Sequence, residues 1–210
     1  MSRLLAVLTH GIMNKTTDPS WPDHFDAYLL DRHPGVKSIK QRYAAGPFPL
    51  WNVLWKNPSH AASLVEEIQV LMNPHDRICF VGHSNGTDVN LRAVKMLAGV
   101  GIKTDVMVLI GSVVGSDVQR SGILPLIESG ALRKAVAYCS PLDSAVGLPL
   151  IGVYGRLGKT GFQWGGQDFA TSSIFTRWFP GYEHSTYFSG TGTGSPRQDT
   201  FEKLWSDMKL

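Results

Sequence analysis

The chain has 210 residues, of which 43% are hydrophobic and 18% are charged, and its formal net charge is +3. These values predict one globular domain, covering residues 1–210, with a sizeable core. The lysines and arginines are scattered, so no nucleic-acid partner is expected, and no apolar run approaches the roughly 20 residues of a membrane span, so stable membrane insertion is not expected.

Short continuous apolar runs predict strands that are buried on both faces of a parallel sheet. In chain order these runs are Leu4 to Leu8, Ile78 to Val81, Val106 to Ile110 and Ala135 to Cys139. Residues 36 to 44 form a less regular strand candidate. Ile174 to Phe179 is another, and we expect it nearer the sheet edge because polar residues interrupt it.

Helical periodicity fills the gaps between these runs. The apolar stripes comprise Trp21, Phe25, Tyr28 and Leu29, then Ala61, Leu64, Val65, Ile68 and Leu71, then Val89, Ala93, Met96 and Leu97, and finally Phe201, Leu204, Trp205 and Met208. Ser20 is the expected N-cap of the first helix, and residues 121 to 134 are also expected to be helical. The alternation predicts an α/β fold whose mostly parallel central sheet is covered by helices on both faces.

Cys79 and Cys139 lie in apolar runs far apart in the sequence. Two buried free thiols are a simpler interpretation than a disulfide, and they favour a reducing compartment. The apolar stretch near the N-terminus is only five residues long, which is too short for a secretory signal. We therefore expect a cytoplasmic protein, and the oligomeric state is left open.

The stretch "FVGHSNGTD", residues 80 to 88, places Ser84 directly after a buried strand and before a helix. A sharp turn at this point forces its central residue into a strained backbone conformation. Gly82 and Gly86 are needed because larger side chains two residues before and after would collide. The turn would push the serine hydroxyl outward, and the backbone N–H of Asn85 would face any negative charge that forms beside it.

This G-x-S-x-G pattern in its strand-turn-helix context resembles the nucleophile elbow of the α/β-hydrolase family, with small single-domain esterase- and lipase-like members looking closest. The resemblance implies the chain order serine, acid, histidine. His184 is the only histidine after Ser84. The acid is predicted at Asp143, after the strand "AVAYC", with Asp117 as the rival and Asp168 as a more distant alternative.

The resemblance also implies an oxyanion hole at the end of the first strand, in "LAVLTHGIM". Its two donors would be the backbone N–H groups of Asn85 and Ile12, with Met13 as the alternative to Ile12. Gly11 would allow the backbone to approach the reacting carbonyl, and His10 would be a structural residue of the loop. The chain is too short for a full separate cap domain, so we expect a minimal cap or none.

Bulky residues in two segments are candidates for an acyl-binding wall; the first segment could instead form a small lid, with core packing as its equal alternative, and the second could border the pocket. Residues 46 to 59 contain Phe48, Leu50, Trp51, Leu54 and Trp55, and residues 147 to 169 contain Tyr154, Phe162 and Trp164. His83 lies inside the elbow and is expected to point away from the serine. The substrate-binding candidates are Gly11, Met13, His83, Trp51 and Trp55.

Together these features predict a serine hydrolase that cleaves small-molecule carboxylic esters, with short acyl chains, through an acyl-enzyme intermediate. Such chemistry needs no cofactor and no metal. Thioesterase, acyltransferase or lipase activity would use the same residues. A non-catalytic ligand-binding protein of the same fold is the alternative from a different class, because a fold does not confer activity.

Overall fold

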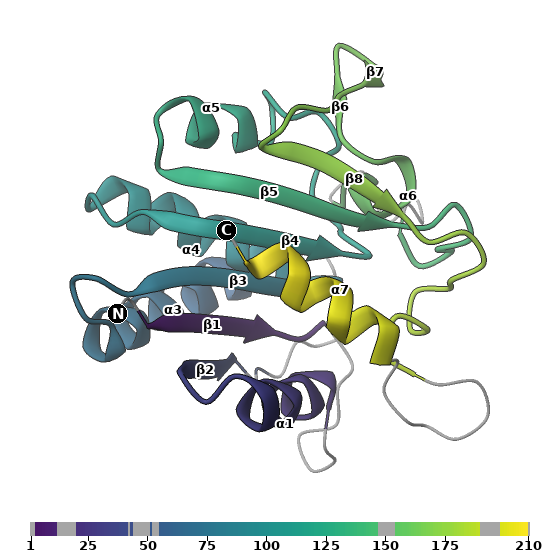
Figure 1. Ribbon diagram of the computed structural model, residues 1–210. Coiled ribbons are helices and arrows are strands. Elements are labelled where there is room, and N and C mark those ends of the chain that lie inside the picture. Colours follow the sequence, from purple (N-terminus) through teal and green to yellow (C-terminus); the bar gives the residue numbers. More distant parts are fainter. Residues whose placement is uncertain are drawn as a thin grey trace.

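A six-stranded sheet forms the centre of the computed structural model, which describes residues 3–11, 20–41, 43, 51, 55–146, 154–189 and 198–209 (Figure 1). The strand order is β2-β1-β3-β4-β5-β8, and every neighbouring pair is parallel. The strands are β1 (Leu4–Thr9), β2 (Val36–Gln41), β3 (Arg77–His83), β4 (Thr104–Ile110), β5 (Leu132–Cys139) and β8 (Ile174–Trp178). The predicted parallel sheet is confirmed, and β8 lies at its edge as expected.

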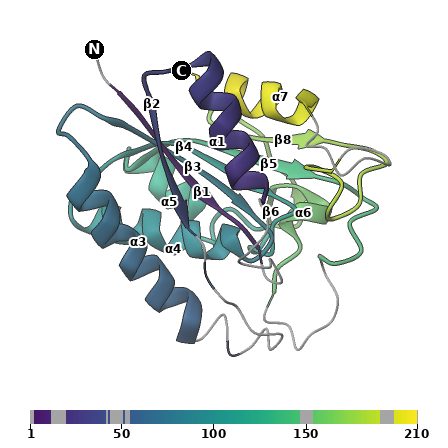
Figure 2. The ribbon, with the colours of Figure 1, turned by 90° about the horizontal axis from the view of Figure 1, so that it is seen from below.

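Helices cover both faces of this sheet (Figures 1 and 2). They are α1 (Trp21–Arg32), α3 (Asn57–Leu71), α4 (Gly86–Gly99), α5 (Ile123–Glu128), α6 (Leu157–Thr160) and α7 (Gln198–Met208). Side chains alternate between the faces along each strand. In β1, Leu5 and Val7 pack in one hydrophobic cluster with α3, α4 and α5, whereas Leu4, Ala6 and Leu8 pack in a second cluster with α1 and α7.

The first helix begins as its sequence predicts. Ser20 is the N-cap of α1 and forms a reciprocal capping box with Asp23, and Pro22 lies in the first turn. Among the helices of the described residues, none is long and apolar enough to cross a membrane. Both cysteines are buried and free, as expected from their apolar surroundings.

Two details of the predicted helices are wrong. The helix expected over residues 121 to 134 covers only Ile123–Glu128, because Gly130 turns the chain with a φ of 70° and β5 already begins at Leu132. Met96, expected on the buried stripe of α4, is 40% exposed. The buried face of α4 instead includes Asn90 and Val94, and the helix packs against α3 as well as against β3 and β4.

A short antiparallel hairpin, β6 (Gln163–Trp164) and β7 (Gln167–Asp168), was not predicted. Gly165 and Gly166 form its turn with φ values of 58° and 84°. A Gly-Gly pair between two short extended segments is a recognised hairpin signal, because both turn residues need positive φ. The signal is present in the sequence "QWGGQD" and could have been used.

The carboxylate of Asp207 anchors α7 to the sheet. It accepts hydrogen bonds from the phenol of Tyr138 at 2.8 Å and from Nε and Nη2 of Arg177 at 2.6 Å each. Lys134 donates to the backbone carbonyl of Asp207 at 2.9 Å. Because the Asp207 side chain is only 2% exposed, its charge depends on these donors for compensation.

We therefore expect Asp207→Asn to lower the free energy of unfolding by about 2–3 kcal/mol, since hydrogen bonds to charged groups are lost at a buried position. Urea unfolding followed by circular dichroism measures this change. Asp199→Asn is the matched control, because Asp199 lies on the same helix and its hydrogen bond with Tyr182 is exposed. The control should change stability by no more than about 0.5 kcal/mol. Equal effects of the two substitutions would contradict the anchor.

Candidate active site

Ser84 sits in the turn between the end of β3 and the start of α4. It is the one non-glycine residue with positive φ in the described part of the chain, at 55°. Such a conformation costs about 1–3 kcal/mol and persists only where the surroundings enforce it. Here the N–H of Ser84 donates to the carbonyl of Ile110 at 3.0 Å, and the Thr87 hydroxyl donates to the carbonyl of Ser84 at 2.6 Å.

Glycines are required on three sides of this turn. A Cβ on Gly82 would lie 2.7 Å from Nδ2 of Asn90, and one on Gly86 would lie 2.5 Å from the carbonyl oxygen of His10. The prediction that these glycines avoid collisions therefore holds, although Gly86 is constrained mainly by the end of β1. A Cβ on Gly11 would lie 2.7 Å from Cβ of Ser84, so Gly11 lets the first strand's loop approach the serine.

His184, after β8, is hydrogen-bonded to Asp143, after β5. Its Nδ1 lies 2.9 Å from Oδ2 and 3.0 Å from Oδ1 of the aspartate, which is fully buried and also accepts from the N–H of Val146 at 3.1 Å. A carboxylate can only accept, so Nδ1 carries the proton. The Nε2 atom of His184 is then left with a lone pair that can accept a proton.

Gly111, at the end of β4, lies beside the histidine–aspartate pair. A Cβ on this residue would lie 3.0 Å from Oδ2 of Asp143 and 3.1 Å from Nδ1 of His184. The preceding residue, Ile110, accepts the hydrogen bond from Ser84. The backbone of Ser84 and the His184–Asp143 pair are thus both next to the end of β4, at the carboxyl edge of the sheet, where ligands bind in folds of this kind.

The two alternative acids lie elsewhere. Asp117 is on the surface and accepts hydrogen bonds from the N–H groups of Gln119 at 3.0 Å and Arg120 at 2.8 Å. These backbone hydrogen bonds, that of Arg120 foremost, lower the pKa of its carboxyl. Asp168 is exposed in β7. Asp117 thus caps a turn, and of the three aspartates Asp143 is the one beside His184.

His83 does not point away from the site as expected. Its Nε2 donates to the backbone carbonyl of His184 at 2.8 Å, and the two rings lie 4.6 Å apart. The ring of Phe188 meets His83 edge-on at 5.3 Å. Burial, with His184 as the second cause, lowers the pKa of His83 to about 3. His83 is therefore a neutral support of the His184 loop, and its resolved contacts are with the protein, although it was expected among the substrate-binding residues.

This lowered pKa makes stability depend on pH. Between the ordinary histidine value of about 6.5 and about 3, the unfolded chain binds a proton at His83 that the folded chain does not, so the free energy of unfolding falls as the pH falls. His83→Gln removes this contribution. We expect the stability of the wild type relative to the variant to decrease between about pH 7 and about pH 4.5, as measured by urea unfolding.

His24→Gln is the control for this measurement, because His24 is exposed on α1. The comparison shows what the replacement of an exposed histidine alone does to stability at the two pH values. A parallel pH dependence of the wild type and His83→Gln would contradict the burial of a neutral His83.

The expected oxyanion-hole residues are only partly described. Ile12 and Met13 lie outside the described residues. Asn85 is buried at the N-cap position of α4. His10 is also buried, and its Nε2 accepts a hydrogen bond from the N–H of Tyr43 at 3.2 Å. This contact fits the structural role expected for His10.

The aromatic residues expected to form an acyl-binding wall differ in their exposure. Trp51 and Trp55 are 53% and 56% exposed, and their rings lie 4.6 Å apart, so neither is core packing. Phe48, Leu50 and Leu54 lie outside the described residues. Phe162 was expected at the wall, but it is 1% exposed and belongs to the hydrophobic core, because its backbone N–H is bound to Thr176 of β8 and its side chain packs in the same cluster as Ile174. Trp164 is exposed on the hairpin and packs on Phe169.

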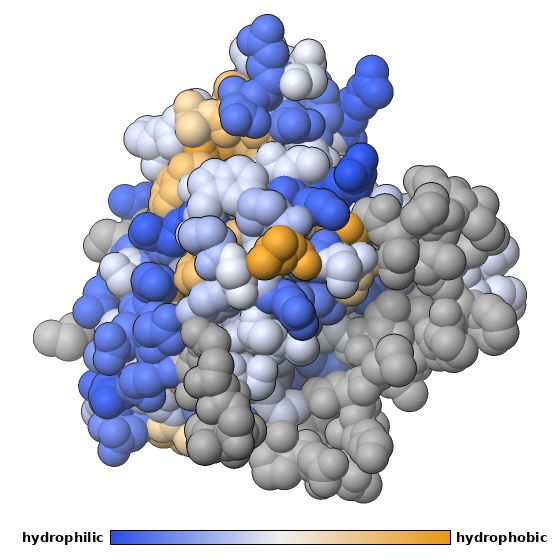
Figure 3. All heavy atoms as spheres, turned by 90° about the vertical axis from the view of Figure 1, so that its right-hand side faces the viewer, coloured by the Kyte–Doolittle hydropathy of each residue, from blue (hydrophilic) through white to orange (hydrophobic). Residues whose placement is uncertain are grey.

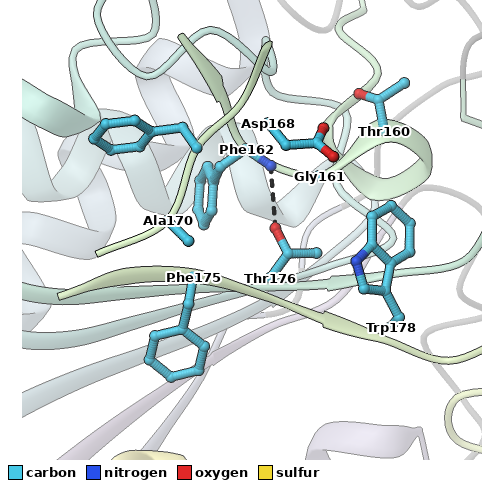
Figure 4. A pocket seen from close by; sticks show the side chains of 9 residues that line it. Thr160, Gly161, Phe162, Asp168, Ala170, Phe175, Thr176 and Trp178 are labelled. Atoms are coloured by element: carbon cyan, nitrogen blue, oxygen red, sulfur yellow. Dashed lines mark hydrogen bonds between the residues drawn. The ribbon is translucent and has the colours of Figure 1, made fainter. Parts of the chain in front are cut away.

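A cavity of about 200 Å³ lies between this hairpin and β8 (Figure 4). Phe162, Thr176 and Trp178 line it, and the N–H of Phe162 donates to the hydroxyl of Thr176 at 3.1 Å. None of Ser84, Asp143 and His184 is among the lining residues. The cavity is therefore separate from the candidate site, and Phe162 faces it rather than the serine.

Figure 3 looks onto the carboxyl edge of the sheet, where the strands of Figure 1 end. The described residues on this face are mostly hydrophilic or intermediate, with small apolar areas between them. Among the described residues no group of three or more histidine, cysteine, aspartate or glutamate side chains is gathered as a metal site requires.

Two features of the site were missed in the sequence. One is the contact of His83 with His184, and the other is a set of polar partners around the Asn85 side chain, including Tyr43 and Asn57. No periodic pattern or motif marks Asn57, which is fully buried at the start of α3. A buried asparagine becomes evident only when its partners from other segments are in place.

The comparisons with known proteins concern the fold. A scan against protein-family models and a search of curated proteins each found no match to this chain. An uncharacterized protein from Bacillus cereus ATCC 10987 is similar in structure, with a TM-score of 0.61 and 13% sequence identity. The alignment covers 100% of this chain but 59% of that one, so this chain spans less than two thirds of its length.

Two further solved structures are similar over nearly the whole of both chains. Esterase PE8 aligns with a TM-score of 0.60 and 15% identity, covering 98% of this chain and 91% of its own. The RedJ thioesterase of the prodiginine pathway in Streptomyces coelicolor aligns with a TM-score of 0.59 and 12% identity, covering 98% and 86%. With the six-stranded parallel sheet and the turn at Ser84, these similarities establish that the chain has the α/β-hydrolase fold.

Proposed function

We propose that the protein is a serine hydrolase that cleaves carboxylic esters through an acyl-enzyme intermediate. The observation that carries the proposal is the strained turn of Ser84 beside a histidine whose Nδ1 is bound to a buried carboxylate. A serine hydroxyl is a poor nucleophile until a base takes its proton, and His184 with a free Nε2 is such a base. A protein that only binds a ligand has no use for this arrangement.

In the proposed reaction the oxygen of Ser84 attacks the ester carbonyl while its proton passes to Nε2 of His184. Asp143 stabilises the imidazolium that forms. The backbone N–H of Asn85 and that of Ile12, which follows Gly11 in the sequence, stabilise the oxyanion. His184 then gives its proton to the leaving alcohol, and a water molecule, deprotonated by the same histidine, releases the carboxylic acid and restores Ser84.

Similarly folded proteins include an esterase and a thioesterase, which favours acyl chemistry for this chain. Thioester cleavage is therefore the second candidate, since it uses the same nucleophile and base with a thiol as the leaving group. The two free, buried cysteines fit the proposed cytoplasmic location. The substrate is proposed to be a small-molecule ester.

We further propose a preference for short acyl chains. The described aromatic candidates for the wall are Trp51 and Trp55, and both are about half exposed. Each methylene buried against them would contribute about 0.8 kcal/mol, but an exposed pair can cover only a few. Short-chain p-nitrophenyl esters, such as the butyrate, are therefore the substrates of choice for the assays below.

Ser84→Ala should leave the fold intact and reduce ester hydrolysis by about 10⁴-fold or more, because the nucleophile is removed. The turnover of p-nitrophenyl butyrate and covalent labelling by a fluorophosphonate probe measure this loss. Labelling of the wild type and not of the variant is expected. A folded wild-type protein that takes up no probe would point to a non-catalytic binding protein of the same fold.

Asp143→Asn should lower kcat by about 10²–10⁴-fold, because an amide cannot hold the same tautomer of His184 or stabilise its positive charge. Asp117→Asn is the matched control and should leave kcat within about two-fold, since Asp117 caps an exposed turn. Steady-state kinetics with p-nitrophenyl butyrate compare the two. The opposite order of effects would reassign the acid.

A further inference from the structure

The side-chain amide of Asn85 is buried and makes four hydrogen bonds to three segments of the chain. Its Nδ2 donates to the phenol oxygen of Tyr43 at 3.0 Å and to Oδ1 of Asn57 at 2.9 Å. Its Oδ1 accepts from Nδ2 of Asn57 at 2.9 Å and from the phenol of Tyr154 at 3.0 Å. Two donors and two acceptor positions are the full capacity of an amide, so every one of them is used.

The direction of these hydrogen bonds is determined by a charged pair. Asp88 is bound to Nε of Arg92 at 2.8 Å, and its carboxylate accepts from Nδ2 of Asn57 at 2.8 Å. Because a carboxylate only accepts, the nitrogen of Asn57 must face Asp88, and its oxygen must face Nδ2 of Asn85. The two amides therefore pair reciprocally in one orientation only.

The partner on the other side is also held rigidly. Tyr43 is 5% exposed, its N–H donates to His10, and its ring stacks on the His10 ring at a centroid distance of 5.1 Å. The ring of His60 lies 4.6 Å from the ring of Tyr43, between ring centroids. Burial raises the pKa of Tyr43, so its phenol stays neutral. Tyr43 is thus a buried partner of the Asn85 amide that is held by His10.

The position of Asn85 makes this arrangement unusual. An asparagine at the N-cap of a helix ordinarily accepts a hydrogen bond from an N–H of the first turn. Asn85 is the N-cap residue of α4, yet its side chain makes no capping hydrogen bond. The amide is instead bound to Tyr43, Asn57 and Tyr154, so the side chain of Asn85 does not cap the N-terminus of α4.

We propose that the side chain of Asn85 is a positioning group for the oxyanion donor that its own backbone N–H supplies; this rests on the proposed function. Asn85 directly follows the strained Ser84, and a peptide group there needs a restraint from outside the turn. The amide network supplies this restraint, because it fixes the side chain at four points. An oxyanion donor stabilises the transition state only when its position is accurate to a fraction of an ångström.

Asn85→Leu, which has a similar shape and no polar atoms, tests the role directly. We expect kcat for p-nitrophenyl butyrate to fall by about 10–100-fold with KM within about two-fold, because the oxyanion exists in the transition state and not in the bound ester. Tyr43→Phe and Tyr154→Phe each remove one hydrogen bond and should lower kcat by about two- to ten-fold. These milder variants decide the question if Asn85→Leu does not fold.

A pair of inhibitors separates positioning from general damage. A trifluoromethyl ketone forms an adduct with the serine that carries an oxyanion, whereas the methyl ketone of the same chain length binds without one. The affinity for the trifluoromethyl ketone should fall by the same factor as kcat in each variant, and the affinity for the methyl ketone should not change. Tyr138→Phe is the matched control, because it removes a buried phenol bound to Asp207 and should leave kcat unchanged.

Folded Asn85→Leu, Tyr43→Phe and Tyr154→Phe proteins with wild-type kcat and wild-type affinity for the trifluoromethyl ketone would overturn the positioning role, while the proposed function would stand on the loss of activity in Ser84→Ala. A rise in KM with unchanged kcat would also overturn it, since the network would then shape substrate binding only. A wild type inert toward both the ester and the fluorophosphonate would remove the proposed function, and the positioning role with it.

Discussion

The left-handed backbone of Ser84 is the constraint around which the site is arranged. Three strands contribute to it, because β3 leads into the turn, β4 accepts the hydrogen bond of the serine N–H, and the end of β1 lies against Gly86. A conformation that costs about 1–3 kcal/mol can persist because the surrounding sheet is already fixed by its core. The same crowding that requires glycine at three positions brings the loop of β1 beside the serine.

Burial of polar groups is the second requirement of this site. Asp143 and Asn85 are both fully buried, and each would destabilise the fold if its polar atoms lacked partners. The partners come from distant parts of the chain, so hydrogen bonds that compensate for burial also connect the segments after β2, β3, β5 and β8. Stability and the geometry proposed for catalysis therefore rest on the same interactions.

The sequence was most informative where the determinants are local or follow chain order. Continuous apolar runs identified β1, β3, β4 and β5, whereas β2 and β8 were less regular candidates. The glycines on either side of Ser84 indicated the turn, because larger side chains would collide there. The chain order implied by the resemblance, with the place of Asp143 after a strand, favoured His184 and Asp143 over the rival Asp117, and the structure places these two residues at hydrogen-bonding distance. The orientation of His83 and the amide pair of Asn85 and Asn57 depend on contacts between distant segments, and no local pattern encodes them.

The anchoring of α7 has a consequence for the order in which the protein is built. Asp207 binds Tyr138 of β5 and Arg177 of β8, so α7 can dock only onto a sheet whose last strands are already paired. During synthesis the chain emerges from its amino end. The face of the sheet that includes Val81, Val108 and Val136 packs against α7, so it is incompletely covered until α7 has formed. Until residues 198–208 have left the ribosome, α7 cannot cover this apolar face, so the interval before they emerge carries the greater risk of aggregation.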